Sequence, residues 1–282
     1  MRFDRIQCNE ANYADYAQLL KNCFPDSNKF SRDYLHWLYK CNPDGEVVGF
    51  DARDGERLVA HYACIPARAQ IGRKEVSVLL SLNTATHPEY GGQGLFTKLA
   101  QLTYQAGAEK GFDCVYGVAN ANSTPVFSRK LGFQVVGPLS ARIGFGPFRI
   151  VFPKIMELQF CRSWNETNLS WRCQNPANKV FVQKQRKQTN FSAKALLSGL
   201  VTAIASMKPT TVLSDNKMTP ESPMRLFIGT VPPGWLRFSL YMNIPDWLRP
   251  SPLNLIYRSL SGRVEKLDPD SIFISFVDFD AY

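Results

Sequence analysis

The chain has 282 residues, of which 45% are hydrophobic and 20% charged, and its net charge is +9. This length allows one large domain or two modest ones, each with a sizeable core, and the composition is that of an ordinary globular protein. The basic residues are scattered, with the densest cluster at Lys184 to Lys187, and no RNA-binding signature accompanies them. We therefore expect nucleic acid not to be the main partner, although the charge alone leaves it open.

The first half alternates between the hydrophobic periods of strands and of helices. Ser31 is the expected N-cap of the second helix, and Gly111 the expected end of the third. This alternation predicts an α/β (mixed α+β) domain over residues 1–146. The expected strands are Arg2–Gln7, Glu46–Ala52, Arg57–Ile65, Val76–Thr86, Asp113–Ala119 and one that begins at Gly132-Phe133; the expected helices are Tyr13–Phe24, Ser31–Tyr39, Leu95–Lys110 and Ser123–Leu131.

The second half, residues 147–282, is less regular. Its segment "NLSWRCQNPANK" (Asn168–Lys179) echoes "DYLHWLYKCNPDG" (Asp33–Gly45), because each has a Trp followed by Asn-Pro. The echo suggests a duplicated unit whose second copy lacks a glycine loop. The expected strands are Val180–Gln185, Met224–Val231, Leu236–Met242, Leu253–Ser259 and Ile272–Phe279, with a buried helix at Ala193–Met207.

The seven cysteines are an odd number, are widely spaced and form no CxxC pair. This pattern argues against a disulfide framework and against a zinc site, so we expect no metal. The N-terminal "MRFDRIQCNE" has no apolar run of a signal peptide, and Ala195–Met207 is too short to span a bilayer. We expect a cytoplasmic protein with no membrane partner.

The segment "THPEYGGQGLFTKLAQ" (Thr86–Gln101) places three glycines between an expected strand and an expected helix. The free N–H groups at a helix N-terminus, together with the helix dipole, can bind phosphate, and glycine lets a ligand approach the backbone closely. The loop has neither the GK[ST] of a P-loop nor the spacing of a dinucleotide motif, where Thr97 would have to be glycine. Such glycines alone are more often only a turn.

The sequence from Asn83 to Val136 resembles the acetyl-CoA-binding core of the GNAT superfamily of N-acetyltransferases. In that family a strand ends in an "hPeyRGxGxG" loop, which is matched here by Pro88 to Tyr90, Gly92 and Gly94. A second family element, an Asn followed by "lYxxlGF", is matched by Asn122 and by "FSRKLGF" (Phe127–Phe133). The resemblance implies the GNAT fold, a central twisted and mostly antiparallel sheet flanked by helices, with a C-terminal α/β GNAT-like half.

The resemblance also implies a set of contacts with acetyl-CoA as co-substrate. The coenzyme's pantetheine arm would pair with the backbone of one strand end, and its pyrophosphate would bind the amides of the glycine loop. Asn122 would approach the pantetheine or the acetyl group. The backbone groups concerned are those of Thr84, Ala85 and Thr86 for pantetheine, and of Gly91, Gly92, Gln93, Gly94, Leu95 and Phe96 for pyrophosphate.

Three residues depart from the family pattern. Gly91 replaces the usual Arg or Gln, and Phe96, which we expect to pack under the helix, replaces a small residue. Ser128 stands where the family often has a tyrosine that protonates the departing thiolate. Because a serine hydroxyl is a poor acid without an assisting neighbour, another group or solvent could take this role, and Ser128 could be a plain helix residue.

The general base is not assigned by the sequence. His87, His61 and Glu89 are candidates, and each is at least as well explained as a structural residue. Some relatives with duplicated acetyltransferase units, such as the enhanced intracellular survival proteins, use a C-terminal carboxylate as the base, and here this carboxylate would belong to Tyr282. The other explanation of the end "SFVDFDAY" is a docked terminal strand with solvated Asp278 and Asp280. Ser128 and Tyr282 are thus the catalytic candidates.

The resemblance implies an acyltransferase that acetylates a primary amine by direct attack on the thioester. We expect a small-molecule acceptor such as an amino sugar, and aromatic residues of the second half either shape its pocket or belong to the core. A homodimer is left open. Two alternatives remain: a non-catalytic acyl-CoA-binding protein, or an aminoacyl-tRNA-dependent transferase related to cell-wall synthesis, for which the positive charge would be suitable.

Overall fold

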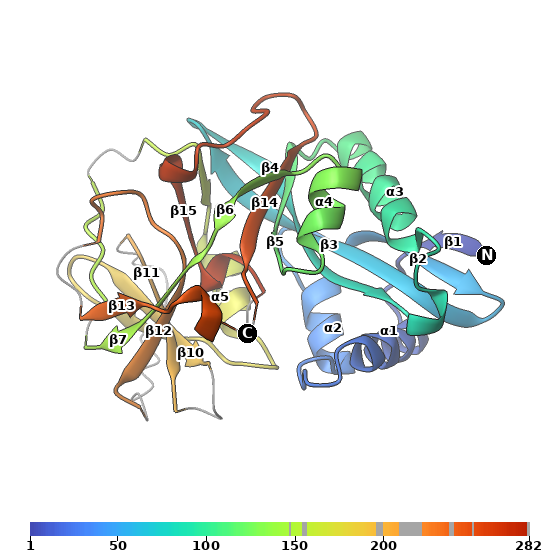
Figure 1. Ribbon diagram of the computed structural model, residues 1–282, viewed down its shortest axis with the longest axis horizontal. Helices are drawn as coiled ribbons and strands as arrows, with labels where there is room; N and C mark the ends of the chain where they lie inside the picture. The colour runs from blue at the N-terminus through green and yellow to red at the C-terminus, as the bar shows by residue number, and fades with distance from the viewer. Residues whose placement is uncertain are drawn as a thin grey trace. The chain divides into compact units, whose positions relative to one another are not determined.

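The computed structural model describes residues 1–146, 148–153, 157–195, 200–208, 222–236, 240–249 and 251–280 (Figure 1). The chain packs into two compact units whose segments interleave along the sequence. Unit 1 comprises Met1–Arg68, Val76–Val135 and Ile256–Lys266, and unit 2 comprises Ala69–Glu75, Val136–Leu255 and Leu267–Tyr282. The two domains expected at 1–146 and 147–282 stay a prediction, because compactness does not by itself define a domain boundary.

Unit 1 is built on a mixed sheet with the strand order β1-β2-β3-β4-β5-β14-β6. The pairs β1–β2 and β2–β3 are antiparallel, whereas β4 and β5 are parallel. The strands are β1 (Arg2–Arg5), β2 (Val48–Asp54), β3 (Arg57–Ile71), β4 (Lys74–Thr86), β5 (Cys114–Ala119), β6 (Gln134–Pro138) and β14 (Asn254–Ser259). The expected strands of the first half are therefore present.

Helices cover both faces of this sheet, with α1 and α2 on one side and α3 and α4 on the other (Figure 1). Neighbouring residues of β3 contact opposite helices: His61 stacks on Tyr39 of α2, whereas the Tyr62 hydroxyl bonds to Tyr104 of α3 at 2.8 Å. The helices are α1 (Glu10–Cys23), α2 (Arg32–Tyr39), α3 (Leu95–Glu109) and α4 (Thr124–Lys130). All four helices expected in the first half are present.

Local signals set the helix ends. Ser31 caps α2 as expected, and Gly111 follows α3 with a φ of +80°, which glycine adopts without strain. Helix α1 begins three residues before the expected Tyr13, because the Asn9 side chain accepts a hydrogen bond from the Asn12 amide. The segment "NEAN" is thus an N-terminal capping signal.

A segment from late in the chain completes unit 1. Strand β14 lies between β5 and β6, and Ile256 joins the same hydrophobic core as Leu79 and Val115. Beyond the strand, the Leu260 amide donates to the Asp113 carbonyl at 2.8 Å. The strand expected at Leu253–Ser259 is present, but it belongs mainly to the first unit.

Unit 2 is rich in strands and contains one short α-helix, α5 (Glu166–Cys173), among its described residues. Strands β9, β10 and β11 are antiparallel neighbours, and β11 is parallel to β12. The strands are β7 (Ser140–Phe145), β8 (Phe160–Arg162), β9 (Phe181–Lys184), β10 (Thr189–Lys194), β11 (Thr202–Met207), β12 (Met224–Thr230), β13 (Tyr241–Asn243) and β15 (Ile272–Ser275). Of the strand expected at Leu236–Met242, residues 237–239 lie outside the described ranges.

The helix expected at Ala193–Met207 is wrong for the described residues, and residues 196–199 lie outside the described ranges. Strands β10 and β11 pair here in antiparallel register, with Phe191 opposite Ala205 and Ala193 opposite Ala203. Ala203 and Ala205 face one core cluster, whereas Ile204 faces another. Because both faces of β11 are buried, its sequence TAIASM does not alternate between apolar and exposed polar residues, and periodicity cannot tell it from a buried helix.

The two echoing segments have the same local structure. Helices α2 and α5 are both followed by a buried Asn whose side chain bonds to the amide two residues later. Asn42 accepts from Asp44 at 3.1 Å, and Asn175 accepts from Ala177 at 2.9 Å. This likeness supports the repeat that the sequence suggests, although a duplicated second copy stays a prediction.

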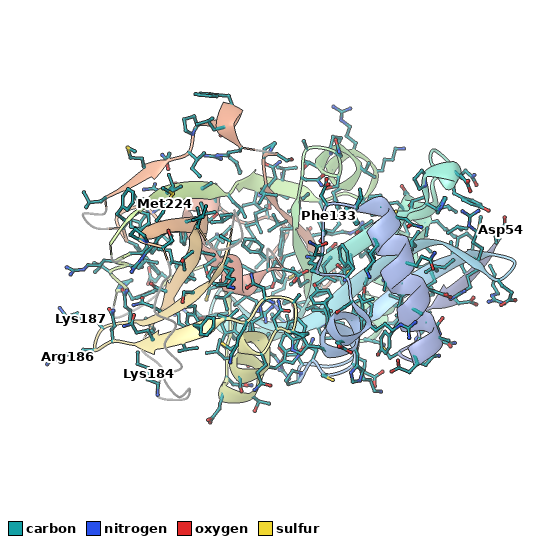
Figure 2. The ribbon with its side chains drawn as sticks, turned by 90° about the horizontal axis from the view of Figure 1, so that it is seen from below. Asp54, Phe133, Lys184, Arg186, Lys187 and Met224 are labelled. Atoms are coloured by element: carbon teal, nitrogen blue, oxygen red, sulfur yellow. The ribbon has the colours of Figure 1, made fainter. Side chains whose placement is uncertain are left out.

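Two surface expectations differ in outcome. The basic cluster from Lys184 to Lys187 occupies the exposed turn between β9 and β10 (Figure 2). Asp278, expected to be solvated, is instead buried, and it accepts hydrogen bonds from Trp164 and Ser275.

No helix in the described ranges combines the length and the apolar character needed to cross a membrane.

Candidate active site

Strand β4 separates from β5 at a strained residue. The parallel pairing of these strands covers Leu79 to Ser81, where Ser81 lies opposite Gly117. Two residues further on, Asn83 has a φ of +45°, the left-handed region that side chains rarely adopt. At its end β4 remains bonded to β3, since the His87 amide donates to the Val59 carbonyl at 2.8 Å. The end of β4 therefore leaves β5 while staying with β3.

The bond between His87 and Val59 shows which backbone groups at the end of β4 point away from β3. The N–H and C=O of one residue in a strand point to the same edge, and neighbouring residues alternate. Because the His87 amide faces β3, the groups of Thr86 and Thr84 face the opposite edge, and those of Ala85 face β3. The Thr86 carbonyl accepts a hydrogen bond from the Cys23 thiol at 3.4 Å, and burial raises the pKa of this thiol.

The glycine loop presents backbone amides at the start of α3. Gly92 and Gly94 have φ values of +77° and +74°, and a Cβ added at either would meet no atom within 4 Å. Gly94 is the N-cap and has no side chain to bond the first-turn amides, and this turn has no acidic residue. Amides of a first helical turn have no intrahelical acceptor, so an anion can bind them.

The Gly91 amide behaves differently from those that follow it. It donates to the Pro88 carbonyl at 3.1 Å, which closes the short 3-10 turn Pro88–Tyr90. Of the loop amides expected to bind pyrophosphate, those of Gly92 to Phe96 are therefore better placed than that of Gly91.

The side chains of "HPEY" hold the loop against the β2–β3 hairpin. The Arg57 guanidinium lies 2.8 Å from both the Glu89 carboxylate and Nε2 of His87. The Tyr90 hydroxyl donates to Asp54 at 2.8 Å. Nε2 of His87 is thus engaged by Arg57. These contacts agree with the structural role that the sequence suggests for His87 and Glu89. Sequence reasoning missed Arg57 and Asp54, which lie in the hairpin segment "DARDGER".

Phe96 packs as expected under α3. Its ring centroid lies 5.7 Å from that of Tyr62 on β3 and 5.2 Å from that of Phe127 on α4. The ring therefore joins α3, α4 and the sheet, while the Phe96 amide remains in the first turn of α3. A large side chain at this position is compatible with phosphate binding by the backbone amide, since the ring packs against the core and the amide lies in the first turn of α3.

The turn after β5 is organised by Asn120, which sequence reasoning missed. Its side-chain oxygen accepts from the amides of Asn122 and Ser123, both at 3.0 Å. This is the local pattern of an Asx turn, and "ANANST" contains the signal for it. Asn122 itself is exposed at this turn, so its side chain is accessible to a ligand.

The two catalytic candidates are not brought together by described contacts. The Ser128 hydroxyl donates to the Pro125 carbonyl of its own helix at 3.4 Å, and Ser128 lines a hollow of about 710 Å³ with Phe133, Tyr257 and Arg258 among others. Tyr282 lies outside the described residues. Neither role is tested, and both stay predictions.

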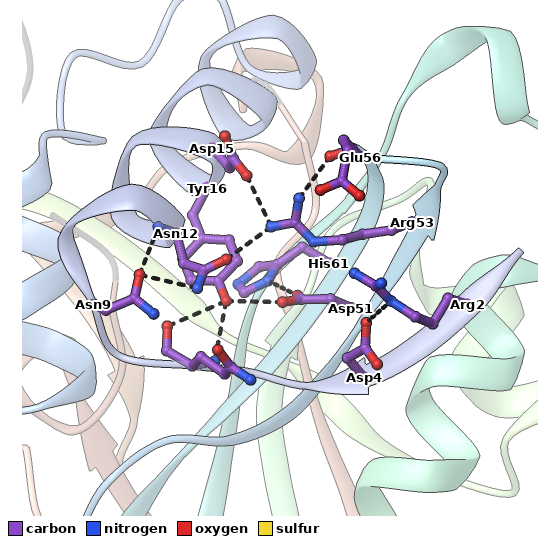
Figure 3. A network of polar contacts seen from close by, with 11 residues as sticks. Arg2, Asp4, Asn9, Asn12, Asp15, Tyr16, Asp51, Arg53, Glu56 and His61 are labelled. Carbon is purple, nitrogen blue, oxygen red and sulfur yellow. Dashed lines mark hydrogen bonds and ion pairs between the residues drawn. The ribbon is translucent and has the colours of Figure 1, made fainter.

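His61, another candidate base, is fully buried in a hydrogen-bond network. Its Nδ1 lies 2.6 Å from Asp51, and its Nε2 lies 2.8 Å from the Tyr39 hydroxyl. Asp51 also accepts from the Tyr16 hydroxyl at 2.8 Å (Figure 3). Burial, reinforced by Asp51, raises the pKa of Tyr16 above its usual value, so that this hydroxyl keeps its proton. With both nitrogens engaged and no exposed surface, His61 cannot reach a substrate.

This fold and this loop define a GNAT acetyltransferase domain, and residues 5–136 match the family described as "Acetyltransferase (GNAT) domain". Residues 5–136 thus carry a GNAT acetyltransferase domain. The resemblance that the loop and "FSRKLGF" indicate is confirmed, as is the GNAT fold of the N-terminal half, which a further strand-rich region follows.

Solved structures with the same fold extend over both units. A GCN5-related N-acetyltransferase from Anabaena variabilis ATCC 29413 matches with a TM-score of 0.59 at 14% identity, over 92% of this chain and 73% of that one. Eis1 from Mycobacterium abscessus matches with a TM-score of 0.59 at 9% identity, over 98% of this chain and 82% of that one. No curated protein matches the sequence.

Proposed function

We propose that the chain is an acetyl-CoA-dependent N-acetyltransferase for a primary amine of a small molecule. The proposal rests on the presence of two backbone features in the same unit. Strand β4 leaves β5 at Asn83, and the amides of Gly92 to Phe96 begin α3 directly after β4. Acyl-CoA suits both features, because its long pantetheine arm can bond to the backbone of β4 and its pyrophosphate can bond to the amides of the loop.

Two details support acyl-CoA at this loop. The glycines have positive φ and open space around their Cβ positions, so a phosphate can approach the backbone. The absence of an acidic residue from the first turn of α3 removes a carboxylate that would compete with the phosphate for the same amides. The pantetheine arm would pair with Thr84 and Thr86, and Asn122 would contact it from the end of β5.

The proposed reaction is a direct transfer. The amine nitrogen attacks the thioester carbonyl carbon, the C–S bond breaks, the nitrogen loses a proton and the thiolate of CoA gains one. A β4 amide would polarise the carbonyl, and holding the two reactants together would supply much of the rate. Ser128 and the Tyr282 carboxylate are the groups proposed to handle the protons. An amino sugar is the acceptor that we expect.

A titration of acetyl-CoA followed by calorimetry tests the binding, and release of the CoA thiol in a panel of amines tests the transfer. We expect saturable binding at one site and thiol release with at least one amino sugar. Binding without thiol release by any amine would favour a non-catalytic acyl-CoA-binding protein. Absence of binding, together with transfer from a charged tRNA, would favour the tRNA-dependent alternative.

A further inference from the structure

The buried network beneath β4 ends at the strained residue of that strand. The Asn83 side-chain amide donates to the Tyr39 hydroxyl at 3.0 Å, and the Tyr39 hydroxyl lies 2.8 Å from Nε2 of His61. The chain of contacts continues from His61 to Asp51 at 2.6 Å. Four side chains from α2, β2, β3 and β4 thus form one continuous connection, and all four are buried.

The contacts fix the donor of one link in this network. The Asn83 amide nitrogen can only donate, so the Tyr39 hydroxyl accepts from it. The Tyr39 hydroxyl also lies against Nε2 of His61, and Nδ1 of His61 lies against the Asp51 carboxylate. Asp51 and His61 lie directly opposite each other in the β2–β3 register, so the sheet fixes this pair. Every member is satisfied, which makes the network rigid.

The network could act either as a proton relay or by positioning Asn83, and the chemistry of the Asn83 amide distinguishes these two roles. A proton relay would have to pass through the Asn83 amide, which does not exchange a proton in the manner of a hydroxyl or an imidazole. His61 and Asp51 have no exposed surface of consequence, at 0% and 2%. The network therefore cannot serve as the general base, and it can act on the site only through the position of Asn83.

We propose that Tyr39, His61 and Asp51 are positioning residues that hold Asn83 in its left-handed conformation and thereby aim the β4 backbone at the acyl thioester. The proposal rests on the function proposed above. Asn83 is the point at which β4 leaves β5, so its φ decides the direction of the amides that follow. A strained backbone residue persists where its surroundings over-determine it, and such residues occur at functional sites.

The test reads the thioester carbonyl directly and needs no acceptor amine. Acetyl-CoA labelled with ¹³C at the carbonyl is bound to the full chain, and its carbonyl stretch is recorded by isotope-edited infrared spectroscopy. Hydrogen bonding to a β4 amide lowers this frequency relative to free acetyl-CoA. We expect the downshift in the wild type and its loss in Tyr39→Phe, which removes the hydroxyl and keeps the ring.

Two substitutions at Asn83 separate the backbone from its side chain. Asn83→Gly is expected to keep the downshift, because glycine adopts positive φ without strain and therefore does not need the network to hold it there. Asn83→Ala is expected to lose it, because alanine resists positive φ. The double variant Tyr39→Phe/Asn83→Gly should regain the downshift. Tyr34→Phe, on the same helix and equally buried but outside the network, is the matched control and should leave the spectrum unchanged.

The outcomes distinguish this proposal from the function on which it rests. If the wild type binds no acetyl-CoA in the parallel calorimetric titration, the proposed function fails and this inference fails with it. If acetyl-CoA binds and Tyr39→Phe keeps the full downshift, only the positioning role is overturned. A loss in Tyr39→Phe that Asn83→Gly does not restore would also overturn it, since Tyr39 would then act by another route.

Discussion

Nε of Arg263 lies 2.8 Å from Oδ1 of Asp113, a residue 150 positions earlier in the chain. The Ser261 hydroxyl donates to the same carboxylate oxygen at 2.7 Å. These contacts fix the segment Ile256–Lys266, which contains most of β14, against the start of β5 in unit 1. The acyl-CoA site proposed here is therefore built on a sheet that the first 146 residues do not complete.

The first prediction concerns that segment. A fragment of residues 1–146 lacks Ile256 and the contacts of Asp113 with Ser261 and Arg263, so we expect it to be unfolded or to lack a cooperative thermal transition. Adding residues 254–267 to this fragment through a flexible linker should restore the transition. Circular dichroism and melting curves measure both. A fragment 1–146 that melts as cooperatively as the full chain would show that β14 is dispensable for unit 1.

The second prediction concerns the glycine loop. Gly92→Val should weaken acetyl-CoA binding by at least about tenfold, because a β-branched residue at positive φ costs about 1–2 kcal/mol or more and will change the path of the loop. Gly72→Val is the matched control. Gly72 has a φ of +60° and open space around it, in the β3–β4 turn. Calorimetry should find normal affinity in this control, and equal losses in the two variants would count against the loop assignment.

The third prediction uses Cys23 as a reporter of ligand at β4. Because the Cys23 thiol bonds to Thr86, CoA bound along this strand should slow its alkylation by about tenfold at a concentration about ten times the Kd. The exposed Cys41 should be alkylated at an unchanged rate and is the internal control. Burial raises the pKa of Cys23, so its alkylation should keep accelerating up to a higher pH than that of an ordinary thiol. Mass spectrometry after timed quenching reads both sites, and equal rates with and without CoA would contradict the placement of the ligand.

The fourth prediction concerns unit 2. Asp278→Asn should lower the free energy of unfolding by about 1–3 kcal/mol, because the buried carboxylate accepts from Trp164 and from Ser275 through different oxygens, whereas asparagine has one acceptor. Asp270→Asn, at an exposed position nearby in the sequence, should change the stability little. Chemical denaturation of both variants measures the difference. A neutral Asp278→Asn would show that these bonds contribute nothing net.

The sequence was most informative where local signals and pattern agree. Ser31 and Gly111 marked helix ends through capping chemistry, and the glycine loop with "FSRKLGF" indicated the family. It failed at β11, because burial on both faces of a strand removes the alternation that distinguishes strand from helix. The position of β14 could not be predicted either, since a strand's partners depend on contacts far along the chain.

Some parts of the candidate site could be predicted from the sequence and others could not. The loop residues could be found because their spacing is local, whereas the network from Asp51 to Asn83 joins four elements that only the folded sheet brings together. Sequence reasoning placed His61 among the candidate bases because of its residue type. The structure shows that its two nitrogens are engaged by Asp51 and Tyr39.

The most direct test of the central claim is a crystal structure of the full chain with acetyl-CoA. We predict that the pyrophosphate lies within hydrogen-bond distance of the amides of Gly92 to Phe96, with the pantetheine arm along Thr84 and Thr86 of β4. A complex in which the pyrophosphate contacts a different part of the chain, with this loop free of ligand, would contradict the account.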